Sequence, residues 1–178
     1  QLLRQLVGFS VTPVPAALLY TADEKTLSGY GQLVVGTDDI EGTIGVRVSR
    51  VDTRVAGPVP TGIPVIDEGN EDTTILPNAS LRARVSPDLQ LRAAVSKTRT
   101  LPNFADLNPA ITLGPPPPGG VGTDSDPRRG SGGNPFLRPF TSWNFDAAAE
   151  YYFGRSSFAS VTGFHRRIDG FIQGNTFR

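Results

Sequence analysis

Residues 74–100, which read TILPNASLRARVSPDLQLRAAVSKTRT, decide the fold of this chain. Two long runs alternate between apolar and polar side chains, which is the period of a β-strand with two different faces. The short stretch Ser86-Pro87-Asp88 joins them and has the composition of a turn. One face carries Ile75, Ala79, Leu81, Ala83 and Val85 in the first run and Leu89, Leu91, Ala93 and Val95 in the second. The opposite face carries Asn78, Ser80, Arg82 and Arg84, and then Gln90, Arg92, Ser96 and Thr98. The pattern predicts a long β-hairpin with one apolar and one polar face.

Two further pairs of runs flank this hairpin and repeat its pattern. The predicted strands are Thr26–Val35 with Thr43–Val55, and Trp143–Phe153 with Ser157–Arg167. In the fifth strand one face carries Trp143, Phe145, Ala147, Ala149, Tyr151 and Phe153, and the other face carries Asn144, Asp146, Ala148 and Glu150. The second strand places Ile44, Val46 and Val48 opposite Gly45, Arg47 and Ser49, and then loses its phase near Arg50 and Val51. We interpret that loss as a bulge or as the exit into a loop.

The connections between the predicted strands alternate in length. Each hairpin closes through a short turn, whereas residues 56–72 and 101–142 form long connections rich in Pro and Gly. Outer-membrane barrels have short periplasmic turns and long extracellular loops, and a strand of roughly 9 to 11 residues crosses a bilayer. The sequence therefore predicts an all-β, antiparallel up-and-down meander of about six long strands at 21–172, forming part of a transmembrane β-barrel. Residues 1–20 are expected to be a loop or short helix, and residues 173–178 to begin the next loop.

Composition excludes several classes of function. The chain has 178 residues, with 17 basic and 17 acidic side chains, so no overall charge attracts nucleic acid. There is no Cys, and His165 is the only histidine, which excludes thiolate sites and multi-histidine metal sites within the chain. No apolar stretch reaches the roughly 20 residues of a membrane-spanning helix. We expect no enzymatic activity, no catalytic or metal-binding residue and no cofactor.

An apolar face shared by several strands is compatible with two environments. In a soluble binding or adhesion module the face packs on a second sheet, whereas in a large barrel it meets lipid. Three features favour lipid: the apolar face is rich in Ala, arginines occupy the opposite face in mid-strand, and aromatic residues gather at the strand ends, as in the girdles of membrane barrels. The aromatic residues at the ends of the fifth strand are Phe140 and Trp143 at one end, and Tyr151, Tyr152 and Phe153 at the other. The polar face then lines a lumen, and its candidate residues are Arg47, Arg82, Arg84, Arg92, Asp146 and Glu150.

Several segments resemble the barrel of TonB-dependent outer-membrane receptors. Residues 133–139, GNPFLRP, are similar to the loop motif GNPxLxP of that family. The residues that match the motif are Gly133, Asn134, Pro135, Leu137 and Pro139. Residues 142–146 (SWNFD) resemble the return into a strand, 150–153 (EYYF) the approach to a periplasmic turn, and 164–172 (FHRRIDGFI) the strand exit FYKxIxxFI. The sequence departs from the family at Phe140, where an acidic residue is usual, and at His165, where an aromatic is common. The resemblance extends from about Thr21 to Ile172.

The resemblance implies a larger protein than the chain. Such receptors are 22-stranded barrels with a plug domain, and they take up a scarce nutrient such as a ferric siderophore, cobalamin or an oligosaccharide. Six strands are too few to close a membrane barrel, which needs about eight. We therefore expect a fragment that is not competent for transport alone. The expected partners are outer-membrane lipid and lipopolysaccharide of a Gram-negative bacterium, the remaining barrel and plug, TonB through parts outside the chain, and a small nutrient ligand. Arg128 and Arg129 are candidate ligand contacts in the long loop, or contacts to lipopolysaccharide phosphates.

Overall fold

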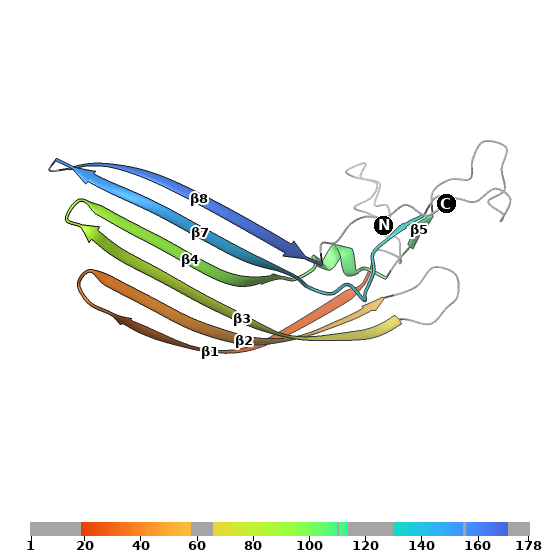
Figure 1. The fold of residues 1–178 in the computed structure, drawn as a ribbon. Coiled ribbons are helices and arrows are strands. Elements are labelled where there is room, and N and C mark those ends of the chain that lie inside the picture. Colours follow the sequence, from red (N-terminus) through yellow and green to blue (C-terminus); the bar gives the residue numbers. More distant parts are fainter. Residues whose placement is uncertain (1–18, 58–65, 110, 114–129, 155, 171–178) are drawn as a thin grey trace, which may run out of the picture.

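Six long antiparallel strands form one open sheet (Figure 1). The structure is a computed structural model that describes residues 19–57, 66–109, 111–113, 130–154 and 156–170. The strands, in their order across the sheet, are β1 (Thr21–Gly36), β2 (Ile40–Gly57), β3 (Ile66–Ser86), β4 (Leu89–Thr100), β7 (Phe140–Phe153) and β8 (Ser157–Asp169). The predicted all-β meander is thereby confirmed. The expected N-terminal loop or helix lies, up to residue 18, outside the described residues, as do residues 173–178.

The connection between β4 and β7 contains structure of its own. It holds the 3-10 helix η2 (Phe104–Leu107) and a small two-stranded sheet of β5 (Ile111–Leu113) and β6 (Gly130–Gly132). Within the described residues, no helix is both long enough and apolar enough to cross a membrane. The candidate ligand contacts Arg128 and Arg129 fall outside the described part of this connection.

The strands at the N-terminal side of the sheet are longer than predicted. β1 begins five residues before the predicted start at Thr26, and β3 begins at Ile66 rather than at Thr74. The bulge predicted near Arg50 and Val51 is wrong, because the register of β2 with both neighbours runs without a shift from residue 41 to residue 56. A register shift occurs elsewhere, between Arg84 and Ser86 in the pairing of β3 with β4.

The two ends of the sheet differ in their connections. The hairpin turns at one end are short, and the turn between β1 and β2 comprises only residues 37–39. Gly36 enters this turn so close to the backbone of Ile40 that a Cβ atom would overlap its carbonyl oxygen. Gly154 begins the turn between β7 and β8 with a φ of 70°, which favours glycine. The connection that carries η2, β5 and β6 lies at the opposite end (Figure 1).

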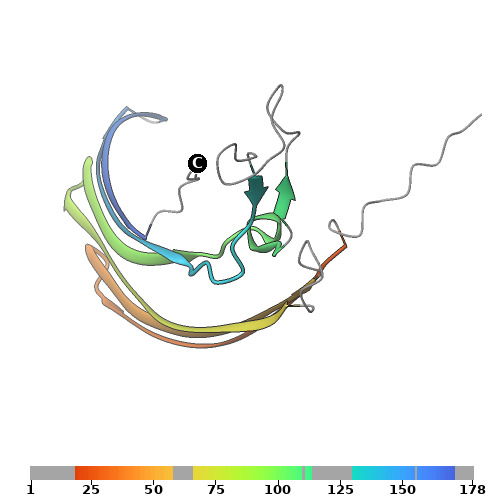
Figure 2. The same cartoon turned by 90° about the vertical axis from the view of Figure 1, so that its right-hand side faces the viewer.

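The sheet curves like part of a cylinder, and the η2, β5 and β6 segment lies inside the curve (Figure 2). The pairing of β3 with β4 ends at Asn78 and Ser96, whereas β4 continues alongside β7 to Thr100. Beyond Ser96, β4 no longer pairs with β3, and Arg99 near its end contacts Asp72 of β3 and Ser49 of β2, residues of the face inside the curve. We call residues 97–109 and 130–139 the inner layer. Val51 and Val55 of β2 and Leu107 of η2 are buried, and Val51 and Val55 lie on the face of β2 between Ser49, which Arg99 contacts, and Gly57, which lies against Pro109.

Candidate functional site

The polar face of the sheet is its concave face. Odd-numbered residues of β2, from Arg47 to Gly57, share one face, and Gly57 lies against Pro109 of the inner layer. Because the inner layer is inside the curve, the face that carries Arg47 is the concave one. The register then places all six candidate lumen residues on this face, namely Arg47, Arg82, Arg84, Arg92, Asp146 and Glu150. The structure thus brings the six together on one surface, while their role in lining a lumen remains a prediction.

The basic side chains of the concave face have partners. Ion pairs join Arg82 to Glu41 at 3.4 Å, Arg84 to Asp39 at 3.8 Å and Arg92 to Glu150 at 3.1 Å. The guanidinium of Arg47 stacks on the ring of Tyr30, 5.4 Å from its centroid. Between Arg82, Arg92 and Asp146 the face is hollowed into a depression of about 370 Å³, floored by small residues. The surface is therefore charged but locally balanced, as suits contact with hydrated or polar groups.

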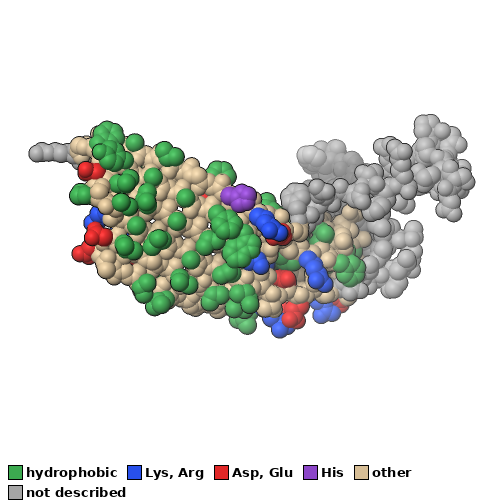
Figure 3. Space-filling view, in the orientation of Figure 1, with side chains coloured by type: hydrophobic (Ala, Val, Ile, Leu, Met, Phe, Trp, Pro, Cys, Tyr) green, Lys and Arg blue, Asp and Glu red, His purple; other side chains and the backbone are tan. Residues whose placement is uncertain are grey.

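The convex face is apolar along most of the sheet. Space filling shows hydrophobic side chains spread over the strands, with charged groups toward the two ends (Figure 3). Leu27 and Val161 on this face are 77% and 76% exposed, far more than a soluble core position allows. Trp143, Phe145, Tyr151 and Phe153 of β7 face the same way, and His165 lies beside Phe145 with ring centroids 6.1 Å apart. An exposed apolar area of this extent indicates contact with lipid or protein.

Tyr152, at the same strand end as Tyr151 and Phe153, faces the other way. Tyr152 lies opposite Phe158 on the concave side, and its hydroxyl donates a hydrogen bond of 2.8 Å to Glu150. The alternation of β7 runs without a shift, so neighbours of Tyr152 on either side face outward. The aromatic cluster at this end of the strand is thus divided between the two faces.

The polarity of the two faces inverts toward the long-loop end. Beyond Val48 the convex positions of β2 and β3 become charged, and Arg50 pairs with Glu71, as Arg54 does with Asp67, each at 2.6 Å. The concave positions of β2 become apolar there, and Val51 and Val55 are 2% and 1% exposed. This inversion, and no bulge, explains the loss of phase in the sequence. It marks the edge of the apolar convex band.

The family loop motif packs as a turn against η2. The amide of Gly133 donates to the carbonyl of Asn108 at 3.1 Å, and the amide of Asn134 donates to that of Asp106 at 2.7 Å. The side-chain oxygen of Asn134 accepts a hydrogen bond of 2.9 Å from the amide of Phe136, which closes the turn. These hydrogen bonds hold the motif in place against residues 106–108. The other motif residues, Pro135, Leu137 and Pro139, lie on the same stretch of chain.

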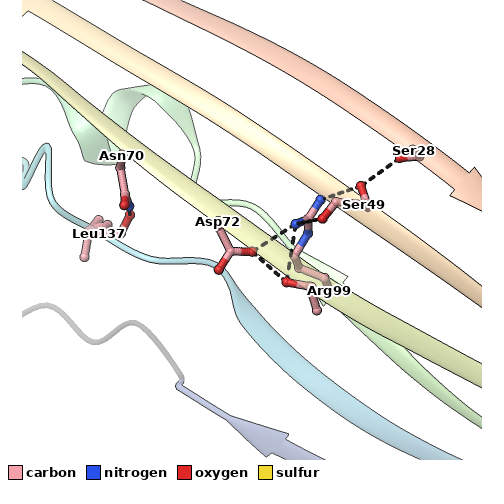
Figure 4. Close-up of polar contacts among 7 residues, drawn as sticks. Ser28, Ser49, Asn70, Asp72, Arg99 and Leu137 are labelled. Atoms are coloured by element: carbon pink, nitrogen blue, oxygen red, sulfur yellow. Dashed lines mark hydrogen bonds and ion pairs between the residues drawn. The ribbon is translucent and has the colours of Figure 1, made fainter.

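A buried polar cluster beneath the inner layer was not predicted. The side chain of Arg99 is 6% exposed, and its guanidinium pairs at 2.9 Å with Asp72, whose side chain is 31% exposed (Figure 4). It also donates to the hydroxyl of Ser49 at 2.9 Å and to the carbonyl of Ser49 at 3.2 Å. Thr74 donates to Asp72 at 2.6 Å, and Ser28 donates to Ser49 at 2.7 Å. The sequence contains one signal of this cluster: Arg99 lies at an even spacing from Leu91 and Val95, so the strand period places a charged residue on the apolar, outward face.

These observations define the class of the protein: an antiparallel wall with an apolar convex face, a charged concave face and short turns at one end, as in outer-membrane β-barrels. A family model described as TonB dependent receptor-like, β-barrel, matches residues 5–177. The chain therefore belongs to this family, which serves nutrient uptake across the outer membrane of Gram-negative bacteria together with TonB. Comparison with curated proteins and with solved structures returned no match.

Proposed function

We propose that the chain forms part of the wall of a receptor for active uptake of a scarce nutrient, a ferric siderophore, cobalamin or an oligosaccharide. In this proposal the convex face contacts lipid, and the concave face borders the path of the ligand. β1 and β8 each have one strand neighbour in the described sheet. Unpaired strand edges are costly in lipid. We therefore propose that further strands complete the barrel and that transport belongs to the complete receptor.

The observation that supports this proposal is the opposite chemistry of the two faces. A soluble binding or adhesion module, the alternative, would cover the apolar face with a second sheet. In the described part of the chain the only second layer lies on the concave side, where Arg99 and Pro109 contact Ser49 and Gly57 of β2. Leucine and valine side chains on the convex face stay exposed. A bilayer is the environment in which such a surface is stable.

Trp143 provides a direct test, because it is the only tryptophan of the chain and faces outward. The receptor, with any tryptophan outside residues 1–178 replaced by phenylalanine, is reconstituted into vesicles of ordinary or brominated phosphatidylcholine, and the fluorescence of Trp143 is measured. We expect strong quenching by brominated lipid. In the control, Trp143→Phe with Asn144→Trp, the fluorophore moves to the concave face and quenching falls.

The soluble module makes the opposite prediction. The proposed function would be overturned if the chain were monodisperse and melted cooperatively in buffer without detergent, and if brominated lipid did not quench the fluorescence of Trp143. The ligand class is tested separately by uptake of labelled ferric siderophore, cobalamin and oligosaccharide in cells with and without the receptor. Arg128 and Arg129 remain candidate ligand contacts, and two adjacent guanidinium groups favour an anionic ligand or lipopolysaccharide phosphates.

A further inference from the structure

The apolar run of the convex face ends at a basic residue on four of the six strands. Going along the convex positions from the short turns toward the long connections, the first residue that carries a full charge is Lys25 on β1, Arg50 on β2, Lys97 on β4 and Arg167 on β8. On three of these strands an acidic residue lies two positions further along, namely Asp23, Asp52 and Asp169. Basic side chains therefore border the apolar band, and acidic side chains follow at a greater distance from it.

Two of these border residues stand on either side of the single tryptophan. Lys97 pairs with Trp143 across β4 and β7, and Trp143 pairs with Arg167 across β7 and β8. The ammonium of Lys97 lies 6.0 Å from the centroid of the Trp143 ring. Neighbouring strands are about 4.8 Å apart, so the backbones of the two basic residues are separated by roughly 10 Å. Both side chains are long enough to reach one group that lies over the tryptophan.

Lys97 and Arg167 differ from Arg50 in the charges around them. Arg50 is paired at 2.6 Å with Glu71, which balances its charge. Lys97, in contrast, forms no ion pair with any of the described residues. The side chain of Arg167 is 73% exposed, and its Nε lies 3.4 Å from Asp169. This pair of basic residues therefore keeps hydrogen-bond donors and positive charge for an external anion.

The border of the apolar band is the level at which a bilayer presents phosphate groups. Tryptophan rings and the charged ends of long basic side chains prefer this level. In outer-membrane barrels the long connections lie outside the cell, where the lipid of the outer leaflet is lipopolysaccharide. Its membrane anchor, lipid A, carries phosphate groups. A guanidinium binds phosphate through two parallel hydrogen bonds, and an ammonium binds it as a point charge.

We propose that Lys97 and Arg167, on either side of Trp143, bind a phosphate group of lipid A at the outer border of the apolar band. This inference rests on the proposed function, because it requires the convex face to lie in the bilayer. It places the anion site on the strands of the wall, whereas Arg128 and Arg129 belong to the long connection. Asp169 lies beside Arg167 and lowers the positive potential of the site.

The test measures the affinity of the complete receptor, refolded in detergent micelles, for fluorescently labelled lipid A that carries two phosphate groups. We expect the double substitution Lys97→Gln with Arg167→Gln to weaken binding by about tenfold or more, because charge-assisted hydrogen bonds to phosphate are lost. The matched control is Arg138→Gln with Arg166→Gln. It removes the same charge from the inner layer and from the concave side of β8, and it should leave the affinity unchanged. Equal affinities of the two double variants would overturn the proposal.

Three further probes distinguish the source of the phosphate. Dephosphorylated lipid A should bind weakly, and the double substitution at residues 97 and 167 should not alter its affinity. Phosphatidylglycerol should bind less tightly than lipid A, and inorganic phosphate should not displace lipid A, because neither supplies both the phosphate and the same acyl chains. Equal affinity for phosphatidylglycerol, or displacement by inorganic phosphate, would overturn the assignment to lipid A.

Asp169→Asn keeps the proposal testable if the double variant fails to refold. It removes the carboxylate beside Arg167 and should tighten the binding of lipid A, an effect that misfolding does not produce. Unchanged or weaker binding by this variant would count against the site. Quenching of Trp143 by brominated phosphatidylcholine does not require Lys97 or Arg167. If quenching persists while the affinity for lipid A is insensitive to all these variants, this inference fails and the proposed function stands.

Discussion

At the scale of single residues, Gly133 shows how the loop motif depends on the absence of one carbon atom. A Cβ at this position would overlap the carbonyl oxygens of Asp106 and Asn108. Both oxygens accept hydrogen bonds from the turn that Gly133 begins. A backbone oxygen cannot rotate away as a flexible side chain does. The glycine is thus required by the packing of two segments 25 residues apart.

The substitution Gly133→Ala should accordingly destabilise the inner layer. Forcing a methyl group against fixed backbone costs about 1–3 kcal/mol. The measurement is the urea midpoint of the refolded receptor, together with labelling of Val51→Cys as a local probe. The control is Gly163→Ala on the convex face, where a Cβ would meet no atom within 4 Å. Equal effects of the two substitutions would contradict this account.

Arg99 and Val51 mark the limit of prediction from sequence at this scale. Val51 is an apolar residue on the polar face of β2, and Arg99 is a charged residue on the apolar face of β4. The sequence shows both interruptions of the alternating pattern, but it does not show their cause. The cause is that the end of β4 contacts the concave face of β2. That contact joins residues 50 positions apart, and no local pattern contains it. The candidate lumen residues, in contrast, follow from alternation alone, and the register places them on one face.

At the scale of elements, β2 combines two surfaces of opposite polarity in one strand. From Ile44 to Val48 the convex positions are apolar, and from Arg50 to Arg54 they are charged. The strand is continuous across this change, as its pairing with β1 and β3 shows. Prediction by hydrophobic period therefore ended the second strand two residues early and began β3 eight residues late. The period was correct only where the strand crosses the apolar band.

A cysteine scan along β2 should reveal the inversion. In the receptor reconstituted into lipid vesicles, we expect a water-soluble maleimide to label Arg50→Cys and Arg54→Cys but not Val46→Cys, because lipid covers only the apolar band. On the other face Arg47→Cys should react and Val55→Cys should not, because Val55 is 1% exposed. Labelling that follows a single parity along the whole strand would contradict the inversion.

At the scale of the whole molecule, the two ends of the sheet differ in the length of their connections. The turns at one end contain few residues, whereas the connection that holds η2, β5 and β6 leaves from the other. In outer-membrane barrels the short turns face the periplasm. The inner layer would then lie toward the outside of the cell. Phe136 in this layer is 60% exposed and accessible to a large probe.

Epitope tags test this orientation. A tag inserted after Phe136 should be detected by antibody on intact cells, whereas a tag inserted after Asp38 should be detected only after the outer membrane is permeabilised. Each insertion site is a surface connection, and such sites tolerate added chain better than strands do. Comparable amounts of both proteins in isolated membranes serve as the control. Detection of the Asp38 tag on intact cells would show the opposite orientation.

The three residues that join β1 to β2 have a consequence for how such a chain can vary over evolution. Adding or removing one residue in residues 37–39 would shift Gly36 and Ile40 relative to each other, since the turn has no slack to absorb it. A shift of one residue exchanges the two faces of a strand. The side chains of β1 that suit lipid would then point inward. We therefore expect changes in length to be tolerated at the loop end and not at the turn end, because the number of residues in a turn determines which side chains face inward and which face outward.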